Sequence, residues 1–151
     1  MRHLRTLITG LTISMLLSAQ SAATAPQVNV YKTATCGCCA KWVEHLKTNG
    51  FSVNVTEVAS VAPYQEKYGV PDGMQSCHTA VVKGYTIEGH VPAADIHRLL
   101  KSRSKAKGLA VPGMPMGSPG MEQGGRVDPY HVIAFTKDGK KTVFAKHGGA
   151  K

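Results

Sequence analysis

The chain has 151 residues and a formal net charge of +9, so it has room for one domain of ordinary size. The densest basic run, residues 101–107, follows a predicted helix and has no interleaved aromatic residues, and we interpret it as a solvated helix end. A nucleic-acid-binding protein would need a basic stripe with aromatic side chains, so we expect no nucleic-acid partner.

The N-terminus has the layout of a secretory signal peptide. Two arginines precede an apolar run over residues 7–17, and small residues follow it. The run is too short to span a bilayer, which needs roughly 20 apolar residues. We predict a signal peptide over residues 1–23 with cleavage after Ala23. Cleavage after Ala25 is less favoured because it would leave Pro26 as the first residue of the mature chain.

Apolar periodicity predicts a β-α-β-α-β-β-α order between residues 26 and 107. The predicted strands cover residues 28–32, 51–58, 78–82 and 85–88, and the predicted helices cover 38–48, 63–68 and the segment that starts at Pro92. A tight turn at Lys83 and Gly84 makes the last two strands an antiparallel hairpin. This order is typical of the thioredoxin superfamily, so we predict an α/β fold with a thioredoxin-like core.

The C-terminal part of the chain has a different composition. Residues 108–121 contain three methionines with several glycines and prolines and show no helical or strand period, which predicts an irregular loop. Segments 131–135 and 142–145 flank a turn at Asp138 and Gly139 and should form a β-hairpin. We therefore divide the mature chain into a core, residues 26–107, and an extension, residues 108–151, whose Met-rich loop and hairpin pack on that core.

Three of the four cysteines lie where the first strand meets the first helix, at Cys36, Cys38 and Cys39. Two structural disulfides fit poorly, because Cys38 and Cys39 are neighbours and a bridge between them would be strained. A helix N-terminus lowers the pKa of a thiol, so we interpret this turn as chemically active. Cys36 and Cys39 have the C-x-x-C spacing of thiol–disulfide oxidoreductases, which is the alternative function.

The predicted topology brings further candidate ligands to this turn. The third strand starts, and the fourth ends, at the pole where the first strand ends, so Cys77, His78 and His90 should lie beside the cysteine turn. Cys77 stands where thioredoxin-like oxidoreductases usually carry a cis-proline, which favours metal binding over disulfide exchange. His78 and His90 are equally compatible with ligand and structural roles. The histidines interpreted as structural or solvated are His45, His97, His131 and His147.

The types of donor favour copper. Thiolates and thioethers prefer cuprous ions, and no carboxylate lies within or immediately beside the cysteine turn. Zinc is the alternative, because four cysteines can form a closed tetrahedral site. Three thiolates in one turn are better placed to bridge several ions than to converge on one. Met114, Met116 and Met121 are candidate soft ligands in the loop, and gap filling is their alternative role.

These residues resemble the CopG-type periplasmic family, a domain of unknown function associated with copper resistance. The motifs that carry the resemblance are Cys36-Gly-Cys-Cys39, Ser76-Cys77-His78, Gly89-His90-Val91-Pro92 and residues 108–121. The resemblance implies a thioredoxin-like fold, copper bound through the cysteines, and copper handling in the envelope of Gram-negative bacteria. It is also compatible with redox interconversion of the ion.

We therefore predict a periplasmic protein for copper resistance or homeostasis. It should capture several cuprous ions per chain in a thiolate cluster, with the methionine loop as a lid or entry ligand. Its expected partners are copper ions and other envelope copper-handling proteins. After signal cleavage we expect no membrane partner.

Overall fold

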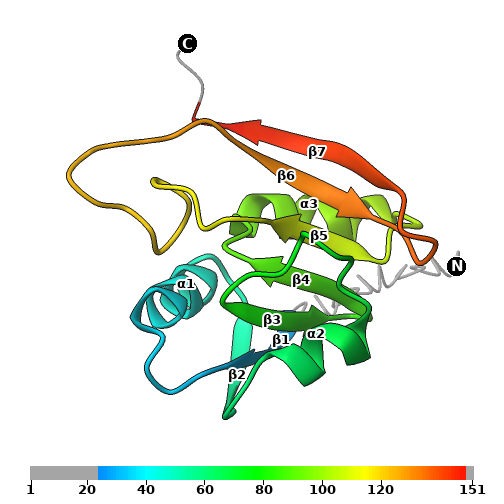
Figure 1. Ribbon diagram of the computed structural model, residues 1–151, viewed down its shortest axis with the longest axis horizontal. Coiled ribbons are helices and arrows are strands. Elements are labelled where there is room, and N and C mark those ends of the chain that lie inside the picture. The colour runs from blue at the N-terminus through cyan, green and yellow to red at the C-terminus, as the bar shows by residue number, and fades with distance from the viewer. Residues whose placement is uncertain (1–23, 149–151) are drawn as a thin grey trace, which may run out of the picture.

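The computed structural model describes residues 24–148, which form one seven-stranded mixed sheet with three helices (Figure 1). The strand order across the sheet is β2-β1-β3-β4-β5-β6-β7. The predicted signal peptide, residues 1–23, lies outside the described residues. Within residues 24–148, no helix is both long and apolar enough to cross a bilayer.

The predicted order of elements is present, with ends shifted by one or two residues. The strands are β1 (Gln27–Lys32), β2 (Ser52–Glu57), β3 (His78–Val82), β4 (Tyr85–Gly89), β5 (Gly108–Val111), β6 (Tyr130–Phe135) and β7 (Lys141–His147). The helices are α1 (Gly37–Thr48), α2 (Ala62–Tyr68) and α3 (Ala93–Ser102). β1 pairs parallel with β2 and antiparallel with β3, and β3 and β4 form the predicted hairpin.

The segment predicted as an irregular loop begins with a strand, so that part of the prediction is wrong. β5 pairs parallel with β4 and antiparallel with β6, and it thereby joins the C-terminal hairpin to the sheet. All four of its residues are buried, so the strand lacks the alternation of a strand with one solvated face. Gly108 is required at its start, because a β-carbon there would collide with the carbonyl oxygen of Thr86.

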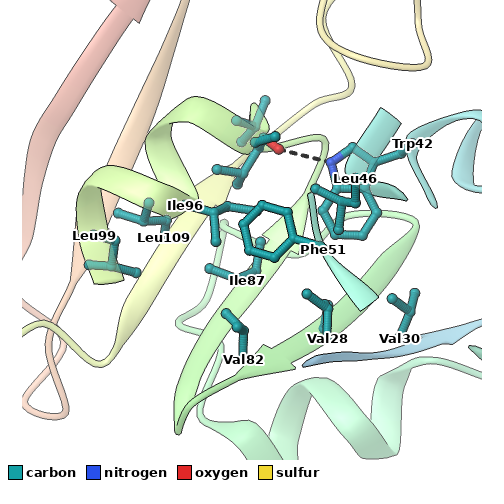
Figure 2. Packing of buried hydrophobic residues seen from close by; sticks show 14 of the residues in the cluster. Val28, Val30, Trp42, Leu46, Phe51, Val82, Ile87, Ile96, Leu99 and Leu109 are labelled. Carbon is teal, nitrogen blue, oxygen red and sulfur yellow. Dashed lines mark hydrogen bonds between the residues drawn. The ribbon is translucent and has the colours of Figure 1, made fainter. Parts of the chain in front are cut away.

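The main core lies between the sheet and the two helices α1 and α3 (Figure 2). Trp42 and Leu46 on α1 and Ile96 and Leu99 on α3 are fully buried, which the helical spacing of apolar residues predicts. The indole N–H of Trp42 donates a hydrogen bond of 2.9 Å to the carbonyl oxygen of Val91 (Figure 2). This bond ties α1 to the segment that leads into α3.

Two further contacts fix the outer elements. On the other face of the sheet, Tyr31 of β1 stacks on Tyr64 of α2 with ring centroids 4.2 Å apart. On the α3 side, His147 at the end of β7 contacts the buried carboxylate of Asp95 at 2.6 Å. The interpretation of His147 as a solvated hairpin residue is therefore wrong, because a carboxylate distant in sequence lies beside it.

Candidate metal centre

The cysteine turn forms the start of α1. The helix begins at Gly37, one residue earlier than predicted, and Cys36 is its N-cap residue with an extended backbone. Cys38 and Cys39 follow in the first turn, where unpaired backbone N–H groups favour negative charge. The sulfur atoms of Cys36 and Cys38 lie 3.6 Å apart.

Cys36 and Cys39 are joined by a disulfide, whereas the predicted cluster uses all four cysteines as thiolates. Their α-carbons are 5.3 Å apart, within the ordinary range for a disulfide. The helical turn brings these two residues together, whereas the neighbours Cys38 and Cys39 could not have paired without strain. Cys38 and Cys77 are the free cysteines among the described residues. Ligation of a metal by Cys36 and Cys39 therefore requires their reduction to thiols.

Cys77 lies beside this turn, as the topology predicts. It immediately precedes β3, and its carbonyl oxygen is 3.7 Å from the sulfur of Cys39. The sulfur atoms of all four cysteines lie within 4.8 Å of one another. Cys77, His78 and His90 form a second group of ligand atoms within the same limit, so Cys77 belongs to both groups. Metal ligation by these residues stays a prediction.

His90 directs a free ring nitrogen at Cys77. Its Nδ1 lies 2.7 Å from the carbonyl oxygen of Pro119, which can only accept a hydrogen bond, so Nδ1 carries the proton. Nε2 then has a lone pair, and it lies 3.1 Å from the sulfur of Cys77. A backbone carbonyl that fixes the ring in this way is the usual support for a metal-binding histidine.

His78 is a buried imidazole without a complete set of hydrogen bonds. Its ring packs against Trp42 with the ring planes tilted by 40°, and its Nδ1 lies 3.4 Å from the sulfur of Cys77. Its buried Nε2 has no partner among the described residues. Burial, and secondarily the neighbouring His90, lowers the pKa of His78 to about 3. The ring is therefore neutral at physiological pH, which is the form that binds metals.

The thiol of Cys77 is hard to ionise in the absence of a metal. Burial, and then the neighbouring Cys38, raises the pKa of Cys77 to about 12. Cys77 is thus a neutral thiol at pH 7, and a metal ion must displace its proton to bind the sulfur.

The carboxylate of Glu88 fixes Ser76, the residue that precedes Cys77, by a hydrogen bond. The sequence analysis did not predict this role of Glu88. This fully buried carboxylate accepts hydrogen bonds of 2.7 Å from the backbone N–H of Ser76 and from Nε2 of Gln65 on one oxygen. The other oxygen accepts a bond of 2.7 Å from the hydroxyl of Thr79. Gln65 also contacts the Ser76 carbonyl oxygen at 3.0 Å. Both sides of Ser76 are therefore fixed, and Cys77 with it.

The distal part of the methionine loop forms a wall of the site. Ser118, Pro119 and Gly120 are buried, and Gly120 has a φ of +89°. A β-carbon on Gly120 would lie 2.7 Å from the carbonyl oxygen of Cys38, so this segment packs directly on the first turn of α1. In Figure 1 the loop between β5 and β6 accordingly lies at the same end of the molecule as α1.

The three candidate methionines differ in exposure. Met114 is exposed, and Met116 and Met121 are half-buried. Met121 directly follows Gly120 and is thus the one tied most closely to the wall of the site. Ligation by any of the three stays a prediction.

The donors at this site fit a soft metal ion. They are four sulfur atoms and two imidazoles, and neither group includes a carboxylate among residues 24–148. Calcium and magnesium prefer oxygen ligands and would find none in these groups. Thiolate and neutral imidazole suit copper or zinc, and a sulfur-rich set favours the cuprous ion.

Comparisons with known proteins identify close structural relatives. A family model described as "Protein of unknown function, DUF411" matches residues 74–121, which include Cys77, His78 and His90. The chain is similar to two solved structures described as "Copper resistance protein copG", Form 2 and Form 1. The identities are 46% and 47%, and the TM-scores are 0.78 and 0.77. Each match covers 82% of this chain and 98% of the other. No curated protein sequence matches the chain.

Proposed function

Because the chain belongs to the CopG family of copper resistance proteins, we propose that it captures copper ions at the cysteine site for copper resistance or homeostasis. The observation that carries this proposal is the position of the Cys77 sulfur. It lies 3.1 Å from Nε2 of His90 and within 4.8 Å of the sulfur atoms of the other three cysteines. Two distant segments thus present soft donors to one small space.

The cuprous ion is the form of copper that these donors suit best. Reduced cysteines provide thiolates, and His78 and His90 provide neutral nitrogens, which together stabilise a soft monovalent ion. Zinc is the competing ion, because four thiolates can form a closed tetrahedral site. Three cysteines within one helical turn favour copper, since thiolates so placed can bridge several ions.

More than one ion per chain follows from the two overlapping groups of ligands. Cys77 is a member of the four-cysteine group and of the group with His78 and His90. A thiolate shared in this way can bridge two ions. Met114, Met116 and Met121 would act as entry ligands, because a neutral thioether binds a cuprous ion without losing a proton.

A cuprous titration of the reduced protein, under anaerobic conditions and against a chromophoric chelator, tests this function. We expect more than one equivalent of copper to be bound by the wild type. Cys77→Ser should lose most of it, because Cys77 belongs to both ligand groups. Ser52→Ala, at an exposed position of the edge strand β2, is the control and should bind like the wild type. A wild type without tight copper binding, or a Cys77→Ser variant that equals it, would contradict the proposal.

We also propose that the protein is periplasmic and that its core is of the thioredoxin type. Export is supported by the signal-peptide pattern over residues 1–23. The thioredoxin type is supported by the β-α-β-α-β-β-α order and by the cysteine turn after β1. The proposed partners are other copper-handling proteins of the envelope. N-terminal sequencing of the protein from a periplasmic extract tests export, with cleavage after Ala23 expected.

A second candidate function is thiol–disulfide exchange, and the Cys36–Cys39 disulfide is the observation that favours it. Cys38 lies 3.6 Å from Cys36, so a third thiol would compete for any mixed disulfide. Reduction of insulin by the metal-free protein is the discriminating assay. Catalysis that depends on Cys36 and Cys39 would support exchange, and no catalysis together with copper binding would support capture.

Redox interconversion of copper would combine copper binding with thiol–disulfide chemistry. The thiolates of Cys36 and Cys39 can lose one electron each to form their disulfide, while two cupric ions gain these electrons and become cuprous. An external dithiol would then have to reduce the disulfide before the next cycle. Steady-state conversion of cupric to cuprous ion with such a dithiol, lost in Cys39→Ser, would establish this activity.

A further inference from the structure

The lysines of three separate turns gather at the end of the sheet opposite the cysteines. Val82 pairs with Tyr85, Gly108 pairs with both Thr86 and Phe135, and Phe135 pairs with Lys141. The β3–β4 turn, the segment before β5 and the β6–β7 turn therefore lie side by side at one end. The cations in these segments are Lys83, Lys101, Arg103, Lys105, Lys107, Lys137, Lys140 and Lys141, which we call the basic end.

The basic end carries the whole net charge of the described residues. Residues 24–148 contain 15 lysines and arginines and nine carboxylates. Eight of these cations and two carboxylates, Asp72 and Asp138, lie at the basic end, which gives it a formal charge of +6. Lys67 and Glu66, at the adjoining end of α2, cancel each other. The remaining cations and carboxylates are equal in number, so the rest of the molecule is close to neutral.

The cations of the basic end are mostly available for binding, although Nζ of Lys141 donates a hydrogen bond of 2.7 Å to the carbonyl oxygen of Asp72. Seven of the eight side chains are exposed, and Lys107 is half-buried. None of the salt bridges found in residues 24–148 involves them. Lys105 and Lys140 line a shallow hollow of about 300 Å³ together with Ser104, Thr136 and Thr142 and with the apolar residues Ala106, Ala134 and Phe144. The hollow thus brings two cations from separate segments to one space, where both could pair with a phosphate group.

We propose that the basic end is a docking surface for the anionic phospholipid headgroups of a membrane. Seven of its eight cations are lysines, which act as mobile point charges and suit phosphates that have no fixed position. An acidic protein surface holds its carboxylates in place, and arginine would recognise these better. The β3–β4 turn and the β6–β7 turn are about 15 Å apart, at roughly 4.8 Å per strand of the sheet. The cations therefore extend over more than one lipid headgroup.

The contact is electrostatic and leaves the metal centre free. The exposed large apolar residues of residues 24–148 are Val55, Met114, Val127 and Val143, and none of them is at the tip of these turns. Nothing at the basic end would insert into the hydrocarbon, so binding requires anionic lipid. β3 runs from the metal centre at His78 to the basic end at Val82. A docked molecule would therefore hold its cysteines away from the membrane.

This proposal replaces two expectations from the sequence. The sequence alone predicts a solvated helix end over residues 101–107 and no membrane partner for the mature chain. Both expectations considered that run alone. The structure adds Lys83 from one turn and Lys137, Lys140 and Lys141 from another, and the sum is a localised charge.

Sedimentation with lipid vesicles tests the proposal. Vesicles of phosphatidylcholine with phosphatidylglycerol should bind the wild type at about 50 mM salt, and binding should be lost near 500 mM salt, where the charges are screened. Each lysine near an anionic surface contributes about fivefold to binding. The triple variant Lys83→Gln, Lys105→Gln and Lys140→Gln should therefore bind about a hundredfold more weakly.

A second triple variant has the same net charge as the first triple variant and serves as the control. Lys41→Gln, Arg126→Gln and Lys146→Gln remove three exposed cations away from the basic end and should change binding by less than fivefold. Equal losses in the two triple variants, or equal binding to vesicles of pure phosphatidylcholine, would overturn the proposal. Binding to polyglutamate without binding to vesicles would also overturn it and would indicate an acidic protein partner instead.

A third measurement needs no variant. Vesicles that carry a paramagnetic lipid should broaden the backbone amide signals of Lys83 and Lys140 and leave those of Cys38 unchanged. Broadening around Cys38 instead would refute the orientation. Copper binding by the basic-end variant should equal that of the wild type, so the docking surface and the proposed copper function can fail separately.

Discussion

Replacing Glu88 by leucine should loosen Cys77 without touching any sulfur atom. Glu88 is fully buried, and its two oxygens accept hydrogen bonds of 2.7 Å from Ser76, Gln65 and Thr79. Leucine has a similar size but cannot accept these bonds. The Ser76 N–H would then lose its partner, and the residue before Cys77 would no longer be fixed to β4.

The expected cost follows from the groups left without partners. Each buried donor that loses its acceptor costs about 1–3 kcal/mol, and the Ser76 N–H and the Thr79 hydroxyl both do so. The apolar surface of leucine offsets part of this cost, so we expect a loss of about 2–4 kcal/mol in the free energy of unfolding. The affinity for cuprous ion should fall at least tenfold. Glu88→Gln keeps one acceptor oxygen and should have a smaller effect on both quantities.

The control for this prediction lies on the same strand. Thr86 is also fully buried on β4, and its hydroxyl donates a bond of 2.9 Å to the carbonyl oxygen of Tyr68. Thr86→Val removes a buried hydrogen bond between β4 and the end of α2 but leaves Ser76 alone. Thermal unfolding and chelator competition should show that Thr86→Val lowers the melting temperature and not the copper affinity. Equal effects of Thr86→Val and Glu88→Leu on copper affinity would refute a specific role for Glu88.

Four further predictions concern the site. Gly120→Ala should weaken copper binding about tenfold and destabilise the protein by about 2–4 kcal/mol in chemical denaturation. The alanine β-carbon would collide with the backbone of Cys38, and the residue would have to keep a positive φ. A variant that binds copper and unfolds like the wild type would contradict the close packing of Gly120 on α1. Because the pKa of Cys77 is about 12, copper must displace the thiol proton in order to bind the sulfur. Chelator competition should therefore show a copper affinity that falls at least tenfold per pH unit on acidification. A copper affinity independent of pH would show that Cys77 is not a ligand. The metal-free protein should lose stability as the pH falls from 6.5 towards 3, by up to about 1.4 kcal/mol per pH unit. The reason is that His78, with a pKa of about 3, stays neutral in the folded protein, whereas the histidine of the unfolded chain binds a proton. A urea unfolding midpoint that is constant over this range would contradict a buried neutral His78. Cys39→Ser should abolish tight copper binding while Met116→Leu weakens it only a few-fold, because a thioether carries no charge; equal losses would reverse the ranking of these ligands.

The topology and the meeting of the cysteines could be predicted because they follow from local patterns. Short alternating segments and one helical face indicated the strands and α1, and the order of the strands then placed Cys77 beside Cys36. The C-x-x-C spacing also indicated that Cys36 and Cys39 could pair. These predictions used only neighbours in the sequence and the direction of each strand.

The remaining features depend on contacts that the local sequence does not encode. β5 is buried on both faces and shows no alternation, so it could not be told from a loop. Glu88 follows Ile87 in a strand where a carboxylate normally indicates the solvated face, yet its donors come from α2 and from β3. His147 and Asp95 are 52 positions apart in the sequence. The basic end likewise appears only when three turns are brought together.

X-ray absorption at the copper edge of the reduced, copper-loaded protein tests the central claim most directly. We predict the edge of a cuprous ion and a first shell dominated by sulfur, with a smaller contribution from nitrogen and a reduced sulfur count in Cys77→Ser. A first shell of only nitrogen and oxygen, or a sulfur count unchanged by Cys77→Ser, would contradict the capture of copper by cysteines from both segments.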